Sequence, residues 1–372
     1  MKSRGSFRLA TRGSRLARRQ AETVEARLTD RRYEVELVTV ETTGDQIRDE
    51  LIHRLGKTGA FVRELDERVL KGDLDGAIHS MKDMPTEQPE ELVTAAVPER
   101  GPPGDVLITP DGRKLEALPQ GAVVGTSSLR RRAQLLSARP DLTIEPLRGN
   151  IDTRLEKLLA PTLQAEYAAR GGEQLNSYKP SYDDDVDEDP EEWLENRSDL
   201  ERAALRRTVE TEYDAIVLAA AGLERSGLAT EVSFQALPTK TFVPAPGQGA
   251  LAVTSLDDGT ARDLNEALDH PRTRVETTVE RTLLAALGGG CIAPIGIYAV
   301  VQGEHVHAHV QVFDREGQQT VTASQDLPIE NYLEAAQEFA ASLADRGAAE
   351  LIAEARREAD EPNIEESQGA EE

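Results

Sequence analysis

The sequence has one cysteine, Cys291, among its 372 residues. A single thiol excludes an intrachain disulfide framework and a cysteine-based zinc site within one chain. The N-terminal segment also lacks an apolar run long enough for a signal peptide or a membrane span. We therefore expect a soluble protein of the cytoplasm that needs neither disulfides nor a membrane.

Positive charge is scarce as well. The chain holds 68 acidic against 43 basic residues, a formal net charge of -25, and only 8 of the basic residues are lysines. Such a charge disfavours nucleic acid as a partner. An acidic surface stays hydrated in concentrated salt, because the salt screens the repulsion between its carboxylates. We infer a salt-loving microbial source.

Apolar runs of strand length alternate with helix-period segments, which is typical of α/β folds. One series begins with a strand at 7–11 and a helix at 16–28, and a second begins near Asp105. The proline- and glycine-rich segments 98–104 and 243–249 predict two crossings between the series. Two lobes joined by two crossings resemble a hinged, periplasmic-binding-protein-like architecture that holds a ligand between the lobes.

The length fits two or three domains. We assign residues 1–98 and 245–266 to a first α/β domain and residues 105–240 to a second. From about Pro271 the pattern changes to a helix at 272–287, strands at 295–301, 305–313 and 319–325, and a helix at 330–355. This predicts a small α+β third domain over residues 271–357. An acidic insertion at about 160–207 and the acidic tail 358–372 are expected to be solvated or disordered chain without a binding role.

Arginines recur at the predicted strand-to-helix junctions, where open α/β sheets bind ligands. They are Arg12, Arg130 to Arg132, Arg148 and Arg154. Positive charge opposes the helix dipole at these ends. Thr126, Ser127 and Ser128 add hydroxyls and helix N-terminal amides suited to an anion. Single arginines could instead pair with the abundant carboxylates, but the whole set favours a ligand with many carboxylates, which the arginine fork binds well.

Asp83 ends the motif His-Ser-Met-Lys-Asp that follows a predicted strand at 76–78. This places its carboxylate at a strand's carboxyl end, near the arginines. There it could stabilise a developing cation or relay a proton. The spacing is equally compatible with a turn-forming, helix-capping aspartate ahead of Pro85.

Cys291 follows three glycines in a predicted loop. Glycines let a backbone approach a ligand closely, and an accessible loop thiol suits covalent attachment. An isolated cysteine, in contrast, is usually buried and inert. His305, His307 and His309 alternate on one face of a predicted strand, but no ordered set of partner ligands accompanies them, so we expect no metal site.

Six motifs, in order and spacing, resemble the hydroxymethylbilane synthase (porphobilinogen deaminase) family. They lie at 11–14, 79–83, 125–131, 147–150, 246–250 and 289–291. The resemblance covers nearly the whole chain except the insertion and the tail. It implies a three-domain monomeric enzyme that adds four porphobilinogens, with loss of ammonia, to a dipyrromethane primer bound to Cys291 through a thioether. Water then releases the linear tetrapyrrole, hydroxymethylbilane.

The resemblance also implies residue roles, with Asp83 as the catalytic aspartate and no metal. The residues assigned to the cofactor, beside Cys291, are Lys82, Thr126, Ser127, Ser128, Arg130 and Arg131. Those assigned to the carboxylates of the substrate are Arg12, Ser14, Arg148, Arg154 and Arg225. Gly247 and Gly249 fall at the hinge. The family's two loop lysines are not matched clearly, and the candidates here are Arg54, Lys57 and Thr58.

Two other functions are weighed against this one. A non-catalytic two-lobed binder of small anions would explain the arginines and the crossings, because fold does not determine function. It would not explain a third domain with a glycine-rich cysteine loop. A zinc hydrolase built on the histidine strand lacks a convincing ligand set.

Overall fold

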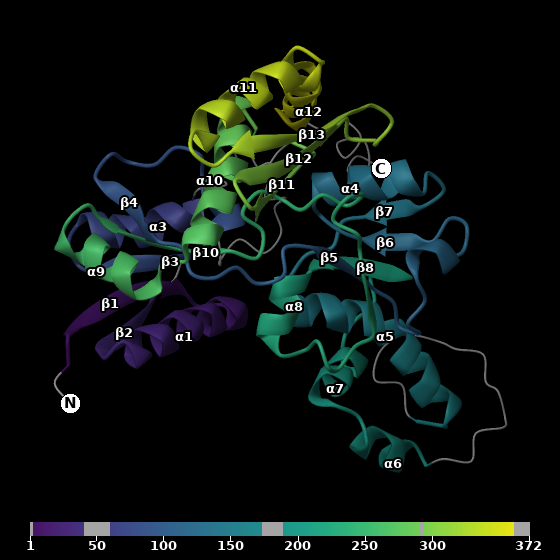
Figure 1. Cartoon of the computed structure of the whole chain (residues 1–372). Helices are drawn as coiled ribbons and strands as arrows, with labels where there is room; N and C mark the ends of the chain where they lie inside the picture. The colour runs from purple at the N-terminus through teal and green to yellow at the C-terminus, as the bar shows by residue number, and fades with distance from the viewer. Residues whose placement is uncertain (1–2, 41–59, 173–188, 290–292, 361–372) are drawn as a thin grey trace, which may run out of the picture.

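The computed structural model of the chain describes residues 3–40, 60–172, 189–289 and 293–360. Strands in these segments form two five-stranded sheets and one three-stranded sheet. Figure 1 shows three units, each built around one sheet with its own helices. The predicted α/β class with an additional C-terminal α+β unit is confirmed. None of the helices in the described segments is long and apolar enough to cross a membrane.

The first sheet has the strand order β2-β1-β3-β10-β4. Its strands are β1 (Gly5–Arg12), β2 (Tyr33–Val40), β3 (Gly76–Ser80), β4 (Leu92–Ala96) and β10 (Leu251–Leu256). Strands β1, β2 and β3 are parallel, whereas β10 is antiparallel to both of its neighbours. The helices of this unit are α1 (Arg15–Asp30), α3 (Ala60–Leu70) and α9 (Gly259–Leu268).

The second sheet repeats this pattern in the order β7-β6-β8-β5-β9. Its strands are β5 (Asp105–Ile108), β6 (Val123–Gly125), β7 (Thr143–Glu145), β8 (Ala215–Ala219) and β9 (Phe234–Ala236). Here β5 is the antiparallel strand beside β8. The other elements of the unit are η2 (Leu115–Ala117), α4 (Leu129–Ala138), α5 (Ile151–Ala169), α6 (Pro190–Glu195), α7 (Asp199–Leu205) and α8 (Ala220–Ser226).

The ends of the acidic insertion are folded, so the prediction of a solvated segment over about 160–207 is wrong for its described parts. Helix α5 continues past Pro161 to Ala169. Trp193 of α6 is buried in an apolar cluster with Leu163 and Leu205. Burial of an indole outweighs the cost of a charged sequence around it. Residues 173–188 lie outside the described part of the chain.

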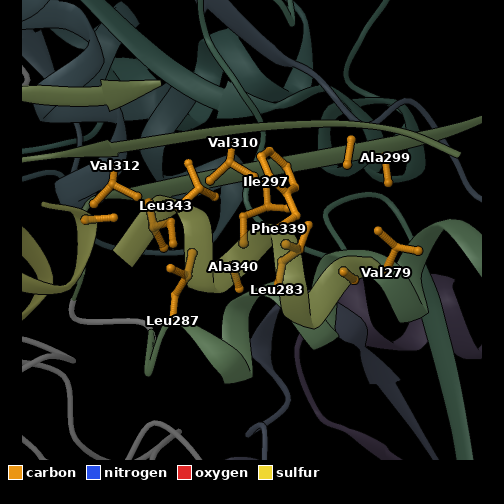
Figure 2. Packing of buried hydrophobic residues seen from close by; sticks show 14 of the residues in the cluster. Val279, Leu283, Leu287, Ile297, Ala299, Val310, Val312, Phe339, Ala340 and Leu343 are labelled. Carbon is orange, nitrogen blue, oxygen red and sulfur yellow. The ribbon is translucent and has the colours of Figure 1, made fainter. Parts of the chain in front are cut away.

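The third unit packs its helices against the sheet β11-β12-β13 through one apolar cluster. Its elements are α10 (Pro271–Ala286), β11 (Ile295–Gln302), β12 (His305–Phe313), β13 (Thr320–Pro328), α11 (Tyr332–Ala344) and α12 (Ala348–Asp360). Figure 2 shows Leu283 of α10 and Phe339 of α11 packed beneath Ile297 of β11. The single helix predicted at 330–355 is two helices, because Gly347 adopts a left-handed φ of 98° between them.

The two crossings between the first two units touch each other. The amide of Gly101 donates to the carbonyl of Gly249 over 3.1 Å. Gly249 has a φ of 86°, and a Cβ there would lie 2.7 Å from the Gly101 carbonyl oxygen. The third unit joins them through Glu280 of α10, which accepts from Arg100 over 2.7 Å and from the amide of Gly247 over 2.6 Å. One buried carboxylate therefore binds both crossings.

Candidate functional site

Asp83 lies in a short 3-10 turn, η1 (Met81–Asp83), directly after β3. Met81 is buried and its amide donates to the carbonyl of Ala250 over 3.1 Å, so the turn rests on the second crossing. A Cβ on Gly247 would lie 2.8 Å from Met81 Cγ, and this contact requires a glycine. The turn therefore holds Asp83 with its side chain exposed at the carboxyl end of the strand.

The loop after Asp83 is held by the third unit. Arg281 of α10 donates to the carbonyl of Pro85 over 2.6 Å and to that of Met84 over 3.4 Å. Helix α10 ends at Ala286, a few residues before Cys291. The helix that leads into the cysteine loop is thus hydrogen-bonded to the segment that carries Asp83.

Arg12 and Ser14 occupy the neighbouring strand end. Arg12 is the last residue of β1, and Ser14 caps α1 by accepting from the amide of Ala17 over 3.2 Å. Both lie at the same edge of the sheet as Asp83, because β1 and β3 are parallel neighbours.

The three predicted hydroxyl residues cluster at the β6–α4 junction. Thr126 Oγ1 accepts from the amide of Ser128 over 3.2 Å, and Ser128 caps α4. Ser127 Oγ donates to the carbonyl of Leu147 over 2.9 Å and accepts from its amide over 3.1 Å. Ser127 therefore ties this junction to the β7–α5 junction, where Arg148 follows Leu147.

Arg130 and Arg131, which the sequence assigns to the cofactor, are paired within the protein. Both are buried, and both pair with the carboxylate of Asp105, Arg130 over 2.8 Å and Arg131 over 2.7 Å. Arg131 also donates to the carbonyl of Val217 over 3.0 Å, and Arg130 to that of Val243 over 2.8 Å. The alternative in which individual arginines pair with carboxylates is correct for these two.

Asp105 holds its charge because of this pairing. Burial would raise the pKa of the Asp105 carboxyl, but the two guanidinium groups outweigh burial and bring the pKa well below its usual range. Gln248 adds a further contact, donating to Asp105 over 2.9 Å and to the carbonyl of Pro103 over 2.7 Å. The paired arginines are thereby connected to the second crossing.

Lys82, Arg148 and Arg154 have a different environment. Among the residues that the structure describes, none of the three has a carboxylate within salt-bridge distance, and Arg154 donates only to the carbonyl of Gly149, over 2.8 Å. Burial lowers the pKa of Lys82, Asp83 opposes this, and Arg131 and Arg154 lower it further. Burial and then Arg131 lower the pKa of Arg154 to about 10. Partly buried cations that lack an ion-pair partner in the described segments fit an anionic group of several carboxylates.

Arg225 lies apart from this cluster, on α8. Its guanidinium donates to the carbonyl of Gly249 over 2.7 Å, and burial lowers its pKa. On the same side of the molecule Arg15 of α1 approaches Asp152 of α5 to 3.8 Å. The first two units thus meet where α1 of the first lies beside α5 and α8 of the second (Figure 1).

The histidines of β12 are bonded to their neighbours on the sheet and on a loop. His307 Nδ1 lies 2.7 Å from Asp326, and His309 Nδ1 lies 2.6 Å from Ser324. In the described segments no group of three or more His, Cys, Asp and Glu side chains is arranged to hold a metal ion. Cys291 and the loop candidates Arg54, Lys57 and Thr58 lie outside those segments.

Sequence reasoning missed Asp105, Gln248 and Arg281. Asp105 opens an entirely apolar strand, and a carboxylate directly before a buried run is a usable signal for a buried counter-charge. Gln248 lies in the motif Pro-Gly-Gln-Gly-Ala, where only the glycines were singled out. Arg281 shows no sequence signal, because its partners are backbone carbonyls almost 200 positions away in the chain.

Comparison with known proteins identifies the relatives of this chain. The family model for the porphobilinogen deaminase dipyromethane cofactor binding domain matches residues 7–179 and 197–263. The model for the porphobilinogen deaminase C-terminal domain matches residues 275–346. Among solved structures, the ectoine-binding protein TeaA of a TRAP transporter is 11% identical over 96% of this chain and 100% of its own, with a TM-score of 0.33.

Curated relatives agree over nearly the full length. A probable porphobilinogen deaminase of Halobacterium salinarum is 50% identical over 95% of this chain and 99% of its own. One of Methanococcoides burtonii is 39% identical over 93% and 96%. The first relative comes from a halophile, in agreement with the source inferred from the charge. The chain belongs to the porphobilinogen deaminase family.

Proposed function

We propose that the reaction of the family takes place in this chain at the facing edges of the first two sheets, with Asp83 as its catalytic residue. The activity is the head-to-tail condensation of four porphobilinogens with loss of ammonia onto a covalent dipyrromethane primer, followed by hydrolytic release of hydroxymethylbilane. The observation that carries the proposal is that Lys82, next to Asp83, and Arg154 have no carboxylate within salt-bridge distance among the described residues.

The donor set fits dipyrromethane. Each of its two rings carries an acetate and a propionate, and Lys82, Arg148 and Arg154 offer charged donors that no carboxylate in the described segments occupies. When bound, the group supplies the primer on which the tetrapyrrole chain grows. Cys291 would hold it through a thioether. Arg12 and Ser14 extend the donor set at the edge of the first sheet where Lys82 lies.

Asp83 would act on the incoming substrate. Its exposed carboxylate can accept from pyrrole N–H groups and stabilise the positive charge that develops as ammonia leaves. Lys82, its neighbour, would bind a carboxylate of the ring beside it. Because Arg281 holds the following loop through two backbone carbonyls, α10 would keep Asp83 aligned with the cysteine loop.

Thr126, Ser127 and Ser128 would line the cofactor side of the site, and Arg130 and Arg131 would support it from beneath through Asp105. Arg148 and Arg154, with Arg225 on α8, would take the side-chain carboxylates of the substrate. The carboxylates of the bound substrate would neutralise the positive charge of these partly buried side chains.

The domain division proposed is 1–98 with 245–266, then 105–240, then 271–357. Gly247 and Gly249 would form the hinge, since both have left-handed φ angles at the point where the crossings touch. Small rotations there would make room for a growing chain.

We also propose that the protein is a cytoplasmic monomer without a nucleic-acid partner, which agrees with the net charge of -25.

The test measures both the covalent attachment of the dipyrrole to Cys291 and the consumption of porphobilinogen. Intact mass and Ehrlich's reagent should detect a dipyrrole adduct on the unaltered protein and none on Cys291→Ser. Asp83→Ala should keep the adduct and the melting temperature but lose nearly all consumption of porphobilinogen. Glu87→Ala, an exposed carboxylate on the same loop, is the matched control. Normal turnover in Asp83→Ala would refute its role, and an unaltered protein that never consumes porphobilinogen would favour the anion binder.

A further inference from the structure

A second basic region borders the proposed catalytic site and shares Arg225 with it, between α1 of the first unit and α8 of the second. It is a cleft of about 660 Å³. Its lining residues are Arg15, Arg18, Arg19, Glu22, Thr23 and Arg225. Figure 1 shows the two helices side by side where the two units approach each other. The cleft therefore combines side chains from both units.

The charge of this cleft contrasts with that of the rest of the protein. Four guanidinium groups share it with one carboxylate, Glu22, in a chain of net charge -25. Within the described segments Arg18 makes no ion pair, and Arg19 donates only to the carbonyl of Arg225, over 3.3 Å. Arg8, exposed on β1, in contrast has Glu36 as a carboxylate partner at 3.2 Å. The sequence supplies many acidic residues, yet Arg18 and Arg19 have no carboxylate partner among the described residues.

The cleft adjoins the proposed catalytic site. Helix α1 starts directly after Arg12 and Ser14, and Arg15 approaches Asp152 in the first turn of α5, near Arg154. Arg225 closes the opposite wall and is bonded to the second crossing. The cleft therefore borders residues that we assign to the substrate.

We propose that the cleft is an outer polycarboxylate site that binds the acetate and propionate groups of the elongated or released tetrapyrrole through Arg18, Arg19 and Arg15. The inference rests on the proposed function. Every ring added brings two carboxylates, and arginine forks bind carboxylates in a bidentate geometry. Because the cleft is open to solvent, its contacts are salt-dependent and suit a transient hold on the chain.

The test is equilibrium binding of uroporphyrin I, a stable octacarboxylate with the same side chains, followed by fluorescence at one fixed KCl concentration. Arg18→Gln/Arg19→Gln should raise its Kd about tenfold, the loss of one or two charged hydrogen bonds. Arg31→Gln/Arg262→Gln removes the same charge from exposed positions of the same unit outside the cleft and should leave Kd unchanged. The Kd of Arg18→Lys/Arg19→Lys for uroporphyrin I should lie between the values of these two double variants.

The outcomes separate this site from the catalytic one. Consumption of the first porphobilinogen should be the same in the double variant and the unaltered protein. An unchanged Kd in the double variant would overturn the outer site and leave the proposed function intact, whereas a chain that consumes no porphobilinogen would overturn the proposed function. Displacement of uroporphyrin I by equimolar inorganic phosphate would mean a general anion site and would also overturn the inference. Arg18→Gln alone, which removes no contact within the described residues, carries the test if the double variant does not fold.

Discussion

Two arginine pairs follow successive parallel strands of the second sheet, and their surroundings differ. Arg130 and Arg131, after β6, are buried against Asp105 and have almost every guanidinium nitrogen bonded within the protein. Arg148 and Arg154, after β7, have no carboxylate partner among the described residues. The same residue type at the same kind of junction is therefore ion-paired in one case and has no ion-pair partner among the described residues in the other.

The difference comes from a strand that is distant in sequence. β5 is antiparallel to β8 and brings Asp105, its first residue, beneath α4. Among the described residues, no carboxylate is paired with Arg148 or Arg154 at the start of α5. A buried ion pair is costly to break, because removal of one partner leaves an uncompensated charge. An unpaired cation at the mouth of a site is instead stabilised when an anionic ligand arrives.

Asp105→Asn should have the largest effect, because it leaves two buried guanidinium groups without a counter-charge. We expect a loss of about 3–5 kcal/mol in the free energy of unfolding, measured by denaturation in constant KCl. Asp111→Asn, whose pair with Arg113 is exposed, should change little. If the two variants have equal free energies of unfolding, the ion pairs of Asp105 with Arg130 and Arg131 do not stabilise the fold, and the proposed difference between the two arginine pairs is wrong.

The arginine pairs can be compared directly by Arg130→Gln and Arg148→Gln. Arg148→Gln should keep the melting temperature and reduce kcat/KM for porphobilinogen by about 10- to 100-fold, the value of one charged hydrogen bond. Arg130→Gln should lower the melting temperature by several degrees, with activity falling as the protein unfolds. A stable but inactive Arg130→Gln would show that this arginine contacts the ligand after all.

Lys82 extends the comparison to pH. Its lowered pKa means that the free protein holds this proton less tightly than the ordinary value of 10.5 implies, so protein stability should rise with pH between the lowered pKa and 10.5. A bound carboxylate favours the charged form, so affinity for porphobilinogen should fall, and protons should be taken up on binding, as pH rises through the lowered pKa. Lys82→Arg should move this fall to higher pH, and an identical profile would exclude Lys82 from the site.

Ser127→Ala should have the smallest effect. It removes the two hydrogen bonds that join the junctions of the two arginine pairs, at a cost of about 1 kcal/mol in unfolding free energy. Because Arg148 follows Leu147, the variant should also raise KM several-fold with little change in kcat. A change in kcat alone would mean that Ser127 acts in the reaction rather than in positioning Arg148.

Much of the architecture could be predicted from the sequence. The strand predicted at 305–313 has the observed bounds of β12, because alternating apolar and polar residues define a half-buried strand. The two prolyl-glycyl crossings and the strand-end position of Asp83 also follow from local pattern. The extent of α5 did not, because a proline normally ends a helix, and here the contact with Trp193 and its neighbours stabilises the continued segment.

The sequence by itself determined the α/β class, the family, and the chemical types gathered at the sheet edges, since periodicity, motif order and composition are local properties. Only the tertiary structure decided which arginines are free to bind a ligand. That depends on where Asp105 and Gln248 fall after the chain has crossed between units, and on which helices meet around Arg18 and Arg19. Charge compensation acts through space at a few ångströms, and so it cannot be assigned from positions along the chain.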